Sequence, residues 1–329
     1  MTIILGIEST AHTFGIGIVR DGKVLANVKR IFTTEEGGLI PIKVAEHHCE
    51  HKNEIYFEAL SEAKLVGKED KIDAIAFSQG PGLAPCLLEG MRFAKELSKK
   101  LDKPLVPVNH CIAHLEVGRT TGAKNPVMLY VSGANTQIIA YESGKYRIFG
   151  ETLDLGTGNF IDTIARYIGL GFPGGPKIQK LAERGKNYIE LPYRVKGMDI
   201  ALSGIQTKIK QLIDSKKYKI EDIAYSLQET VFAMLVETAE RALAHTGKKE
   251  LLLGGGVACN SRLQEMCKIM CHERGCKLFV PDRSLLVDNG AMIAYCGEIM
   301  FKAGINEKNL NKIDINPRQR TDQVEVTWR

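Results

Sequence analysis

The apolar positions of this chain form the same three-strand pattern twice. The first copy predicts strands at residues 3–7, 14–19 and 24–28, and the second at 127–131, 137–141 and 146–149. In each copy a polar turn of small residues follows the first strand, and a hairpin signal, Asp21-Gly22 or Ser143-Gly144, joins the last two. A repeat of this kind indicates that one chain builds two similar units.

After each three-strand unit the pattern changes to alternating helices and strands. The first half predicts a helix at residues 46–63, a strand at 74–77, a tight loop at 78–82, a helix at 87–100 and a strand at 105–108. The second half predicts helices at 220–245, from about residue 260 and at 288–301, and strands at 251–253 and 277–280. This alternation is typical of parallel βαβ units, which bind ligands at the carboxyl ends of their strands. We therefore predict an α/β fold of two lobes, each a mixed five-stranded sheet flanked by helices.

The repeat places the first lobe at residues 1–121 and the second at residues 122–329, with the last helices packing back on the first lobe as an alternative. The second lobe has a helical insertion at about residues 156–218 that the first lacks. Its Gly- and Pro-rich turn at residues 171–176 is typical of a helix end with a close backbone approach. Beyond this turn, near the end of the insertion, five lysines occur: Lys208, Lys210, Lys216, Lys217 and Lys219. Such a run usually marks a solvated helix face, and phosphate binding is the second interpretation.

Composition narrows the class of protein without naming a function. A chain of 329 residues with 44% hydrophobic and 25% charged residues is ordinary for a globular protein of two domains. No apolar run reaches the roughly 18 residues that a membrane span requires. Residues 1–6 enter a strand pattern without a basic segment or a cleavage site, so we predict a cytoplasmic location. A net charge of +5 permits a polyanionic partner but does not require one.

The eight cysteines show no framework of disulfide spacing and are expected to be reduced thiols. Cys267, Cys271, His272 and Cys276 raise the question of a zinc site. Their gaps do not match the usual zinc spacings, and residues 261–273 form an amphipathic helical pattern, so packing is the favoured interpretation.

A pair of histidines, His110 and His114, follows the predicted strand at residues 105–108. If Asn109 caps a helix, the two imidazoles lie on the same helical face, where they can share one metal ion. Two histidines at this spacing are more often core or helix-capping residues than metal ligands. Asp288, at the start of a predicted helix, and Tyr130, at the end of a predicted strand, are further candidate ligands. Their ordinary alternatives are an N-cap for Asp288 and core packing for Tyr130.

Four glycine-bearing turns follow predicted strands: residues 78–82, 132–136, 156–159 and 254–256. None has the Walker or the G-x-G-x-x-G pattern. One such turn is weak evidence, but four in a duplicated fold indicate a nucleotide cleft in which backbone N–H groups and helix N-termini bind phosphate.

Peptidase chemistry is disfavoured, because the residues between His110 and His114 include no glutamate of the H-E-x-x-H type. Cys111 as a nucleophile is expected to point away from the histidine face.

Taken together, the motifs resemble the archaeal and eukaryotic branch of the tRNA N6-adenosine threonylcarbamoyltransferases, the TsaD/Gcp-like family with an actin-like ATPase fold. The resemblance runs nearly end to end. It is carried by residues 8–13, 80–84, 109–114, 130–137, 156–162, 172–176, 202–204, 254–260 and 288–292.

The resemblance implies that His110, His114, Tyr130 and Asp288 hold one divalent metal ion, with iron or zinc favoured and magnesium as an alternative. It implies that ATP, ADP or threonylcarbamoyl-adenylate occupies the cleft, with Val131, Ser132, Gly133 and Ala134 near phosphate and acyl groups. The nucleoside is expected near Asn159, Asp162, Gly175, Gln179 and Asn260. In the family a glutamate binds the ribose where this chain has Gln179, a weaker partner for a hydroxyl.

The implied reaction transfers a threonylcarbamoyl group from its adenylate to N6 of the adenosine adjacent to the anticodon of tRNA. No side-chain nucleophile is expected, and the general base is not identified. The implied partners are a small atypical kinase, separate or fused at the C-terminus, a small dimerising subunit and the other subunits of the KEOPS complex. A small-molecule kinase or ATPase of the same fold and a non-catalytic scaffold are the alternatives.

Overall fold

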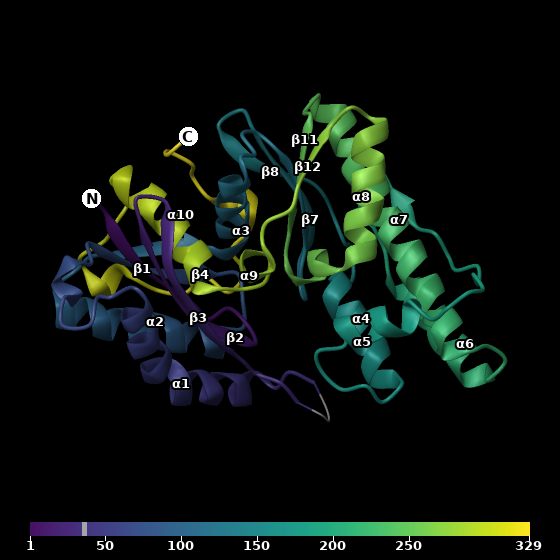
Figure 1. Ribbon diagram of the computed structural model, residues 1–329, viewed down its shortest axis with the longest axis horizontal. Coiled ribbons are helices and arrows are strands. Elements are labelled where there is room, and N and C mark those ends of the chain that lie inside the picture. The colour runs from purple at the N-terminus through teal and green to yellow at the C-terminus, as the bar shows by residue number, and fades with distance from the viewer. Residues whose placement is uncertain (35–37) are drawn as a thin grey trace. The chain divides into compact units, whose positions relative to one another are not determined.

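The computed structural model describes residues 1–34 and 38–329, which form two compact units (Figure 1). The first unit comprises Met1–Phe32, Leu39–Thr120 and Val287–Arg329, and the second comprises Thr33–Gly38 and Thr121–Leu286. The sequence analysis assigned residues 287–329 to the second lobe. In the structure they belong to the first unit, because α10 (Gly290–Lys302) packs on the first sheet.

The first unit contains a five-stranded mixed sheet. Its strands are β1 (Ile3–Glu8), β2 (Thr13–Arg20), β3 (Lys23–Ile31), β4 (Ala74–Gly80) and β5 (Leu105–Asn109), in the order β3-β2-β1-β4-β5. Strands β1, β2 and β3 pair antiparallel, whereas β4 pairs parallel with β1 and β5. The predicted three-strand unit followed by parallel strands is therefore confirmed.

Helices cover both faces of this sheet (Figure 1). They are α1 (Pro41–Glu62), α2 (Ala84–Leu101), α3 (His110–Gly118) and α10, with 3-10 turns at Glu69–Lys71, Arg119–Thr121, Leu310–Lys312 and Thr321–Gln323. Because side chains alternate along a strand, Leu5 and Ile7 lie in a core with residues of α1 and α2, while the opposite face receives α10.

The contact between α10 and the sheet is unusually close, because glycines form it. A Cβ atom at Gly17 would lie 2.1 Å from the backbone nitrogen of Ala291, and one at Gly6 would lie 2.2 Å from that of Ala294. The backbone of the helix therefore rests directly on the backbone of β1 and β2.

The second unit repeats the topology. Its sheet contains β6 (Val127–Val131), β7 (Thr136–Glu142), β8 (Lys145–Glu151), β11 (Glu250–Gly254) and β12 (Lys277–Phe279), in the order β12-β11-β6-β7-β8. Again three antiparallel strands are extended by parallel ones. The duplication predicted from the apolar pattern is confirmed strand for strand.

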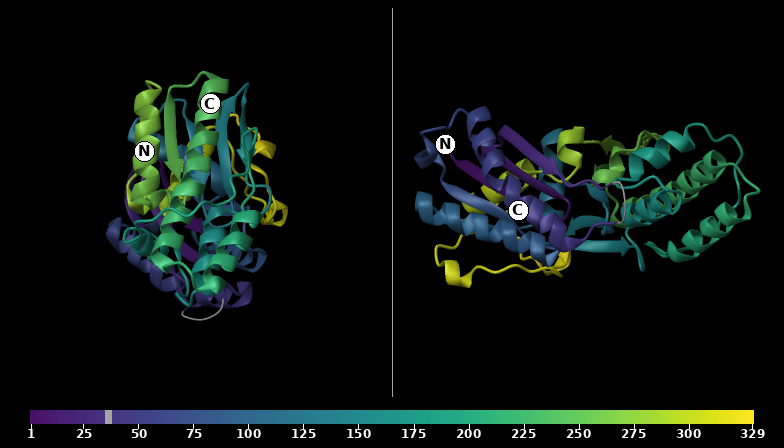
Figure 2. Two further views of the ribbon diagram at one scale, coloured as in Figure 1. Left: turned by 90° about the vertical axis from the view of Figure 1, so that its right-hand side faces the viewer. Right: turned by 90° about the horizontal axis from the view of Figure 1, so that it is seen from below.

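The helical insertion and the segments that follow it complete the second unit, and Figure 2 shows their helices in teal and green. The insertion contains α4 (Thr157–Tyr167), α5 (Gly175–Ala182), the short strands β9 (Val195–Lys196) and β10 (Asp199–Ile200), and α6 (Ser203–Ser215). After it come α7 (Ile220–Thr246), α8 (Ser261–Glu273) and α9 (Arg283–Leu286), with a 3-10 turn at Gly256–Cys259. Cys267 and Cys271 are buried in the core of this unit, as packing residues should be. Within the described residues, no helix is both long and apolar enough to cross a bilayer.

Buried His48 gives the first unit a predicted pH dependence. The ring lies fully buried in α1, its Nε2–H donates to the Ala11 carbonyl at 2.8 Å, and burial lowers its pKa from 6.5 to about 4. Since the unfolded chain binds this proton more tightly, the free energy of unfolding should be fully retained above pH 6.5 and fall by up to about 3 kcal/mol as the pH drops toward 4. Urea unfolding of the wild type and of His48→Gln between pH 4.5 and 7.5 measures this. An equal pH dependence in both proteins would assign it to other groups.

Candidate functional site

The histidine pair lies at the junction of β5 and α3. The Asn109 side chain accepts a hydrogen bond from the Ile112 amide at 3.1 Å, so it caps α3 as the sequence suggests. His110 and His114 consequently lie one turn apart, both nearly fully buried, with ring centroids 4.8 Å apart and planes at 81°.

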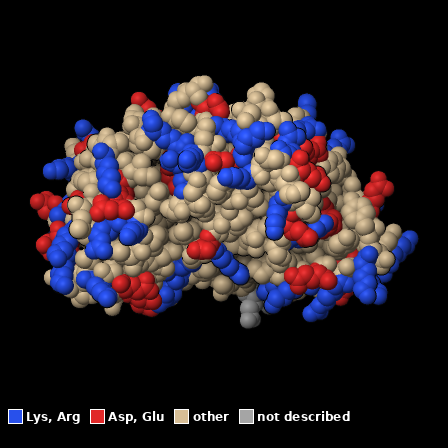
Figure 3. Space-filling model, turned by 45° about the horizontal axis from the view of Figure 1, so that its top comes forward, with Lys and Arg blue, Asp and Glu red and all other residues tan. Residues whose placement is uncertain are grey.

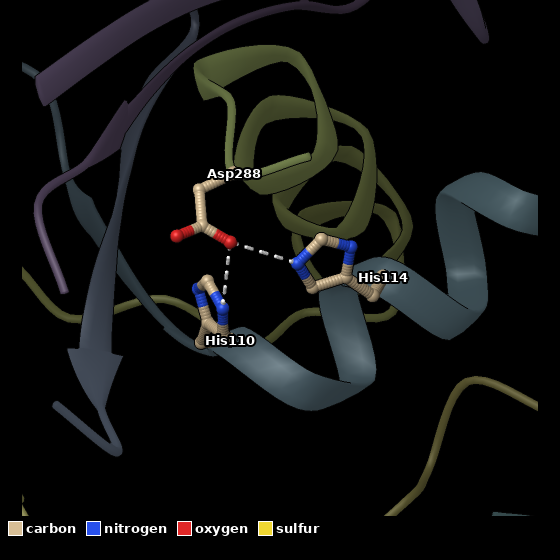
Figure 4. A group of neighbouring side chains, drawn as sticks. All are labelled: His110, His114 and Asp288. Atoms are coloured by element: carbon tan, nitrogen blue, oxygen red, sulfur yellow. Dashed lines mark hydrogen bonds and ion pairs between the residues drawn. The ribbon is translucent and has the colours of Figure 1, made fainter. Parts of the chain in front are cut away.

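Asp288 completes a cluster with these rings (Figure 4). Its Oδ1 lies 3.4 Å from His110 Nε2 and 3.3 Å from His114 Nε2. The ordinary alternative for Asp288, an N-cap, does not apply, because Asn289 accepts the hydrogen bond from the Met292 amide and caps α10. The three side chains are the group of potential metal ligands found in the described part of the chain.

The donor set and its spacing suit a divalent ion. All three ligand atoms lie within 4.8 Å of one another. Ligands about 2.1 Å from a tetrahedral ion are about 3.4 Å apart, which is the spacing of Asp288 Oδ1 from each imidazole nitrogen. Two imidazoles and one carboxylate favour borderline ions over magnesium or calcium, which prefer oxygen ligands.

Glu8, which the sequence analysis did not assign, orients His110. Its Oε2 lies 2.9 Å from His110 Nδ1, and its Oε1 accepts hydrogen bonds from the amide and hydroxyl of Thr10. A carboxylate on Nδ1 fixes the tautomer of an imidazole and leaves Nε2 for a ligand. The available signal was the position of Glu8 at the carboxyl end of β1, in the same sheet as β5.

The charges in the cluster explain the protonation of its members. Burial alone would lower the pKa of His110, but the carboxylates of Glu8 and Asp288 outweigh it and hold that pKa well above the ordinary range. Burial likewise would raise the pKa of Asp288, yet the neighbouring His110 holds it well below. Burial lowers the pKa of His114, and its hydrogen bond to Asp288 opposes this only in part. Without a cation, these shifts favour a proton on His110 and an ionised Asp288, and a cation bound by the three side chains would compete with that proton.

The far end of α3 is fixed by a buried carboxylate. Glu116 is fully buried and accepts hydrogen bonds from Arg119 Nη1 at 2.9 Å and from Trp328 Nε1 at 3.1 Å. Arg329 Nε lies 3.4 Å from the same carboxylate. The last residues of the sequence thus hold the helix that carries both histidines.

Tyr130, the fourth predicted ligand, is a fully buried residue of β6 in the second unit. His110, His114 and Asp288 lie together in the first unit, and the place of Tyr130 beside them stays a prediction.

Three of the four glycine turns meet in the second unit. The amides of Gly158 and Asn159 donate to the carbonyls of Ser132 and Gly133 at 2.9 and 2.8 Å. A Cβ at Gly156 would lie 2.3 Å from the Gly133 carbonyl oxygen. The start of α4 therefore supports the turn after β6, and these two amides are engaged in that support instead of facing a ligand.

The third turn, at residues 254–256, contacts the carboxyl end of β6. Gly255 has φ +89°, and a Cβ there would lie 2.4 Å from the Val131 carbonyl oxygen. The fourth turn, at residues 78–82, belongs to the first unit. The turns at 132–136, 156–159 and 254–256 thus form one backbone cluster at the carboxyl ends of β6 and β11.

The predicted nucleoside contacts occupy two places beside this cluster. Asp162 Oδ1 accepts the Gly174 amide at 2.7 Å and so holds the start of α5, where space around Gly175 is open. Gln179 Nε2 donates to Ser261 Oγ at 3.0 Å. Asn260 caps α8 through Oδ1 and donates to Gln228 from Nδ2. Gln179 therefore lies next to the start of α8. This proximity is a tertiary contact that could not be predicted from the sequence.

Comparison with known proteins agrees with these features. Residues 23–295 match the family described as tRNA N6-adenosine threonylcarbamoyltransferase. A protein of that name from Thermococcus sibiricus is 59% identical over 326 residues, which cover 99% of this chain and 100% of the relative. Another, from Methanococcoides burtonii, is 49% identical and matches 100% of this chain and 98% of its own length.

A relative from Methanosarcina mazei is longer. It is named a probable bifunctional tRNA threonylcarbamoyladenosine biosynthesis protein, is 51% identical over 329 residues, and matches 99% of this chain over 60% of its own length.

Solved structures agree on the fold. HypF of T. kodakarensis superposes with a TM-score of 0.65 at 16% identity over 95% of this chain and 49% of that one. The activator of 2-hydroxyisocaproyl-CoA dehydratase from Clostridium difficile superposes with a TM-score of 0.53 at 14% identity over 92% and 97%. The duplicated sheets are those of the actin-like ATPase fold. By its sequence over nearly its whole length, the chain belongs to the family of tRNA N6-adenosine threonylcarbamoyltransferases.

Proposed function

We propose that this protein transfers the threonylcarbamoyl group from threonylcarbamoyl-adenylate to N6 of the adenosine adjacent to the anticodon of tRNA. The observation that carries the proposal is the 59% identity, over 99% of the chain, to a relative named for this acyl transfer. The buried histidine cluster and the glycine turns are the chemical features that the reaction would use.

The transfer needs no nucleophilic side chain. The N6 amine of the RNA attacks the carbamoyl carbon of a mixed anhydride, the bond from that carbon to the phosphate oxygen breaks, and AMP leaves with the electron pair. The amine then loses a proton. In the turn at Val131, Ser132, Gly133 and Ala134, Val131 pairs with Thr136 and the Ser132 amide donates to the Asn135 carbonyl at 2.8 Å. The amides of Gly133 and Ala134 are therefore the backbone donors that would take up the charge developing on oxygen.

His110, His114 and Asp288 would hold a divalent metal ion, with iron or zinc favoured by the imidazole donors, and Tyr130 is the proposed fourth ligand. Such an ion supplies Lewis acidity that polarises and orients a carbonyl or carboxylate of the acyl group. Glu8 would keep His110 in the tautomer that offers Nε2, while Asn109 and Glu116 hold α3 in place.

The glycine-turn cluster would bind the nucleotide, either ATP or ADP or the adenylate. A HypF structure is described as nucleotide-bound and the dehydratase activator as carrying ADPNP, and both share the fold at low identity. Asn159, Asp162, Gly175, Gln179 and Asn260 are the proposed nucleoside contacts.

We further propose that the protein acts with partners in the cytoplasm. The bifunctional relatives extend beyond the region that this chain matches, which supports a partner domain that is fused in some proteins and separate in others. A small kinase, a small dimerising subunit and the remaining KEOPS subunits are the proposed partners.

The test is reconstitution. The protein, the proposed partners, threonylcarbamoyl-adenylate and unmodified tRNA are incubated, and the nucleosides are analysed by mass spectrometry. Threonylcarbamoyladenosine in the tRNA supports the proposal. Phosphorylation of a small molecule or protein by this chain alone, with no modified nucleoside, would favour the kinase alternative.

Gln179 allows a finer test of the nucleotide site. Gln179→Ala should weaken nucleotide binding about three- to tenfold, since one neutral hydrogen bond to the ribose is lost. Gln179→Glu should strengthen it, because a carboxylate is the better acceptor. Calorimetric titration with ADP measures both, and Gln211→Ala on the exposed face of α6 is the control. An unchanged affinity in Gln179→Ala would remove Gln179 from the site.

A further inference from the structure

The insertion, together with Lys219 directly after it, holds the net positive charge of the chain. Residues 156–219 contain twelve Lys or Arg and five Asp or Glu, a net charge of +7, whereas the whole chain carries +5. The remainder is therefore slightly acidic. Ten of the twelve cations are exposed: Arg166, Lys177, Lys180, Arg184, Lys186, Arg194, Lys196, Lys216, Lys217 and Lys219. Figure 3 shows Lys and Arg side chains gathered at this end of the second unit, at the lower right.

Across residues 1–34 and 38–329, no ion pair within 4.0 Å joins any of these twelve cations to a carboxylate. Some cations elsewhere are paired: Arg262 contacts two glutamates, Arg274 contacts Glu240, and Lys302 contacts Asp21 and Glu298. A solvated helix face usually interleaves both signs. An excess of unpaired cations instead creates a field that attracts a polyanion.

Exposed aromatic rings accompany the charge. Four tyrosines of the described chain are exposed, and all lie in the insertion: Tyr167, Tyr188, Tyr193 and Tyr218. Exposed tyrosine among cations is the composition of surfaces that stack unpaired bases while tracking a phosphate backbone. Three of the four hydroxyls form hydrogen bonds: that of Tyr167 with Asp214, that of Tyr188 with Thr230 and that of Tyr193 with Glu237.

Tyr167 lies at the end of the helix that leads away from the glycine turns. It is the last residue of α4, the helix that begins at the glycine turns and carries Asn159 and Asp162. With a rise of 1.5 Å per residue, its Cα is about 12 Å along the helix from that of Asn159. Lys210 of α6 lies 5.2 Å from the centroid of the Tyr167 ring. A nucleotide beside an adenosine held at the turns could thus reach a ring that is already flanked by a cation.

We propose that the surface formed by α4, α6 and the lysines at 216–219 binds the unpaired anticodon loop of the substrate tRNA, with Tyr167 stacking on a base. This rests on the proposed function and assigns a place to its RNA substrate. The cations supply attraction to phosphate, and the tyrosine supplies a stacking platform that does not depend on sequence.

Fluorescence anisotropy of the full chain with labelled unmodified tRNA, at several salt concentrations, tests the surface. Tyr167→Ala should weaken binding about 5- to 150-fold, while Tyr167→Phe should stay within about twofold, since it keeps the ring and loses only the bond to Asp214. A triple variant, Lys216→Ala with Lys217→Ala and Lys219→Ala, should lower the slope of log affinity against log salt by about two. The matched control replaces three exposed lysines of the first unit, Lys68, Lys71 and Lys308.

The outcomes separate this inference from the proposed function. If wild type modifies tRNA in the reconstituted reaction but the Tyr167 and lysine variants bind and modify it normally, the surface is wrong and the function stands. If wild type neither binds nor modifies tRNA, the function itself fails. If the variants bind tRNA normally but no longer associate with a partner protein, the surface belongs to that protein, and the RNA inference is overturned.

Discussion

Replacing both His110 and His114 by glutamine should remove the bound metal and lower threonylcarbamoyl transfer at least about 100-fold. Loss of residues that merely orient ligands lowers activity or metal affinity 10- to 100-fold, and loss of two ligands should exceed that. Glutamine is preferred to alanine, because alanine at both positions would leave Asp288 without its two imidazole partners and Glu8 Oε2 without the His110 ring. Metal content by elemental analysis and product nucleoside by mass spectrometry measure the two effects.

The matched control for this prediction is His272→Gln, an exposed histidine of α8. It should leave metal content, transfer and melting temperature unchanged. Thermal unfolding distinguishes loss of the site from loss of the fold, since the glutamine variant should still unfold cooperatively. Unaltered metal content in the double variant would eliminate the cluster as the metal site, whatever its activity.

Gly17→Ala should strongly destabilise the protein although it adds only one methyl group. Its Cβ would lie 2.1 Å from the backbone nitrogen of Ala291 and 2.4 Å from the carbonyl carbon of Gly290, and neither atom can move without moving α10. We expect a loss of about 3 kcal/mol in the free energy of unfolding, at the upper end for an overpacked core. Because Asp288 immediately precedes this helix, metal affinity should fall as well.

Gly204→Ala is the control for the added methyl group. No heavy atom lies within 4 Å of its Cβ position in the first turn of α6, so stability should be unchanged or slightly higher. Chemical denaturation and metal titration measure both variants. Wild-type stability and metal affinity in Gly17→Ala would mean that α10 does not hold Asp288 in place through this contact.

The sequence by itself determined the features that depend on near neighbours. The alternation of apolar residues and the hairpin signals predicted both three-strand units, and the structure shows each unit within a five-stranded sheet. Asn109 was predicted as a cap from the residues beside it, and the structure confirms it. Such features are local, because period, turn type and capping depend on residues a few positions apart.

Tertiary structure decided which distant residues meet. The sequence left Asp288 as either a cap or a ligand, and only the fold shows Asn289 as the cap and Asp288 facing both histidines. Glu8 was missed because its partner, His110, is 102 residues away. Residues 287–329 join the first unit because glycines on β1 and β2 admit the backbone of α10, a fit that periodicity does not encode.

The lysine run shows the same division at the surface. From the sequence alone, the lysine run of the insertion was interpreted as a solvated helix face. Whether the cations have acidic neighbours, and whether Tyr167 is exposed beside Lys210, depends on how α4 and α6 pack. Local patterns fix which elements form, whereas the approach of one element to another depends on the side chains at their contact, and that is set only once the chain has folded.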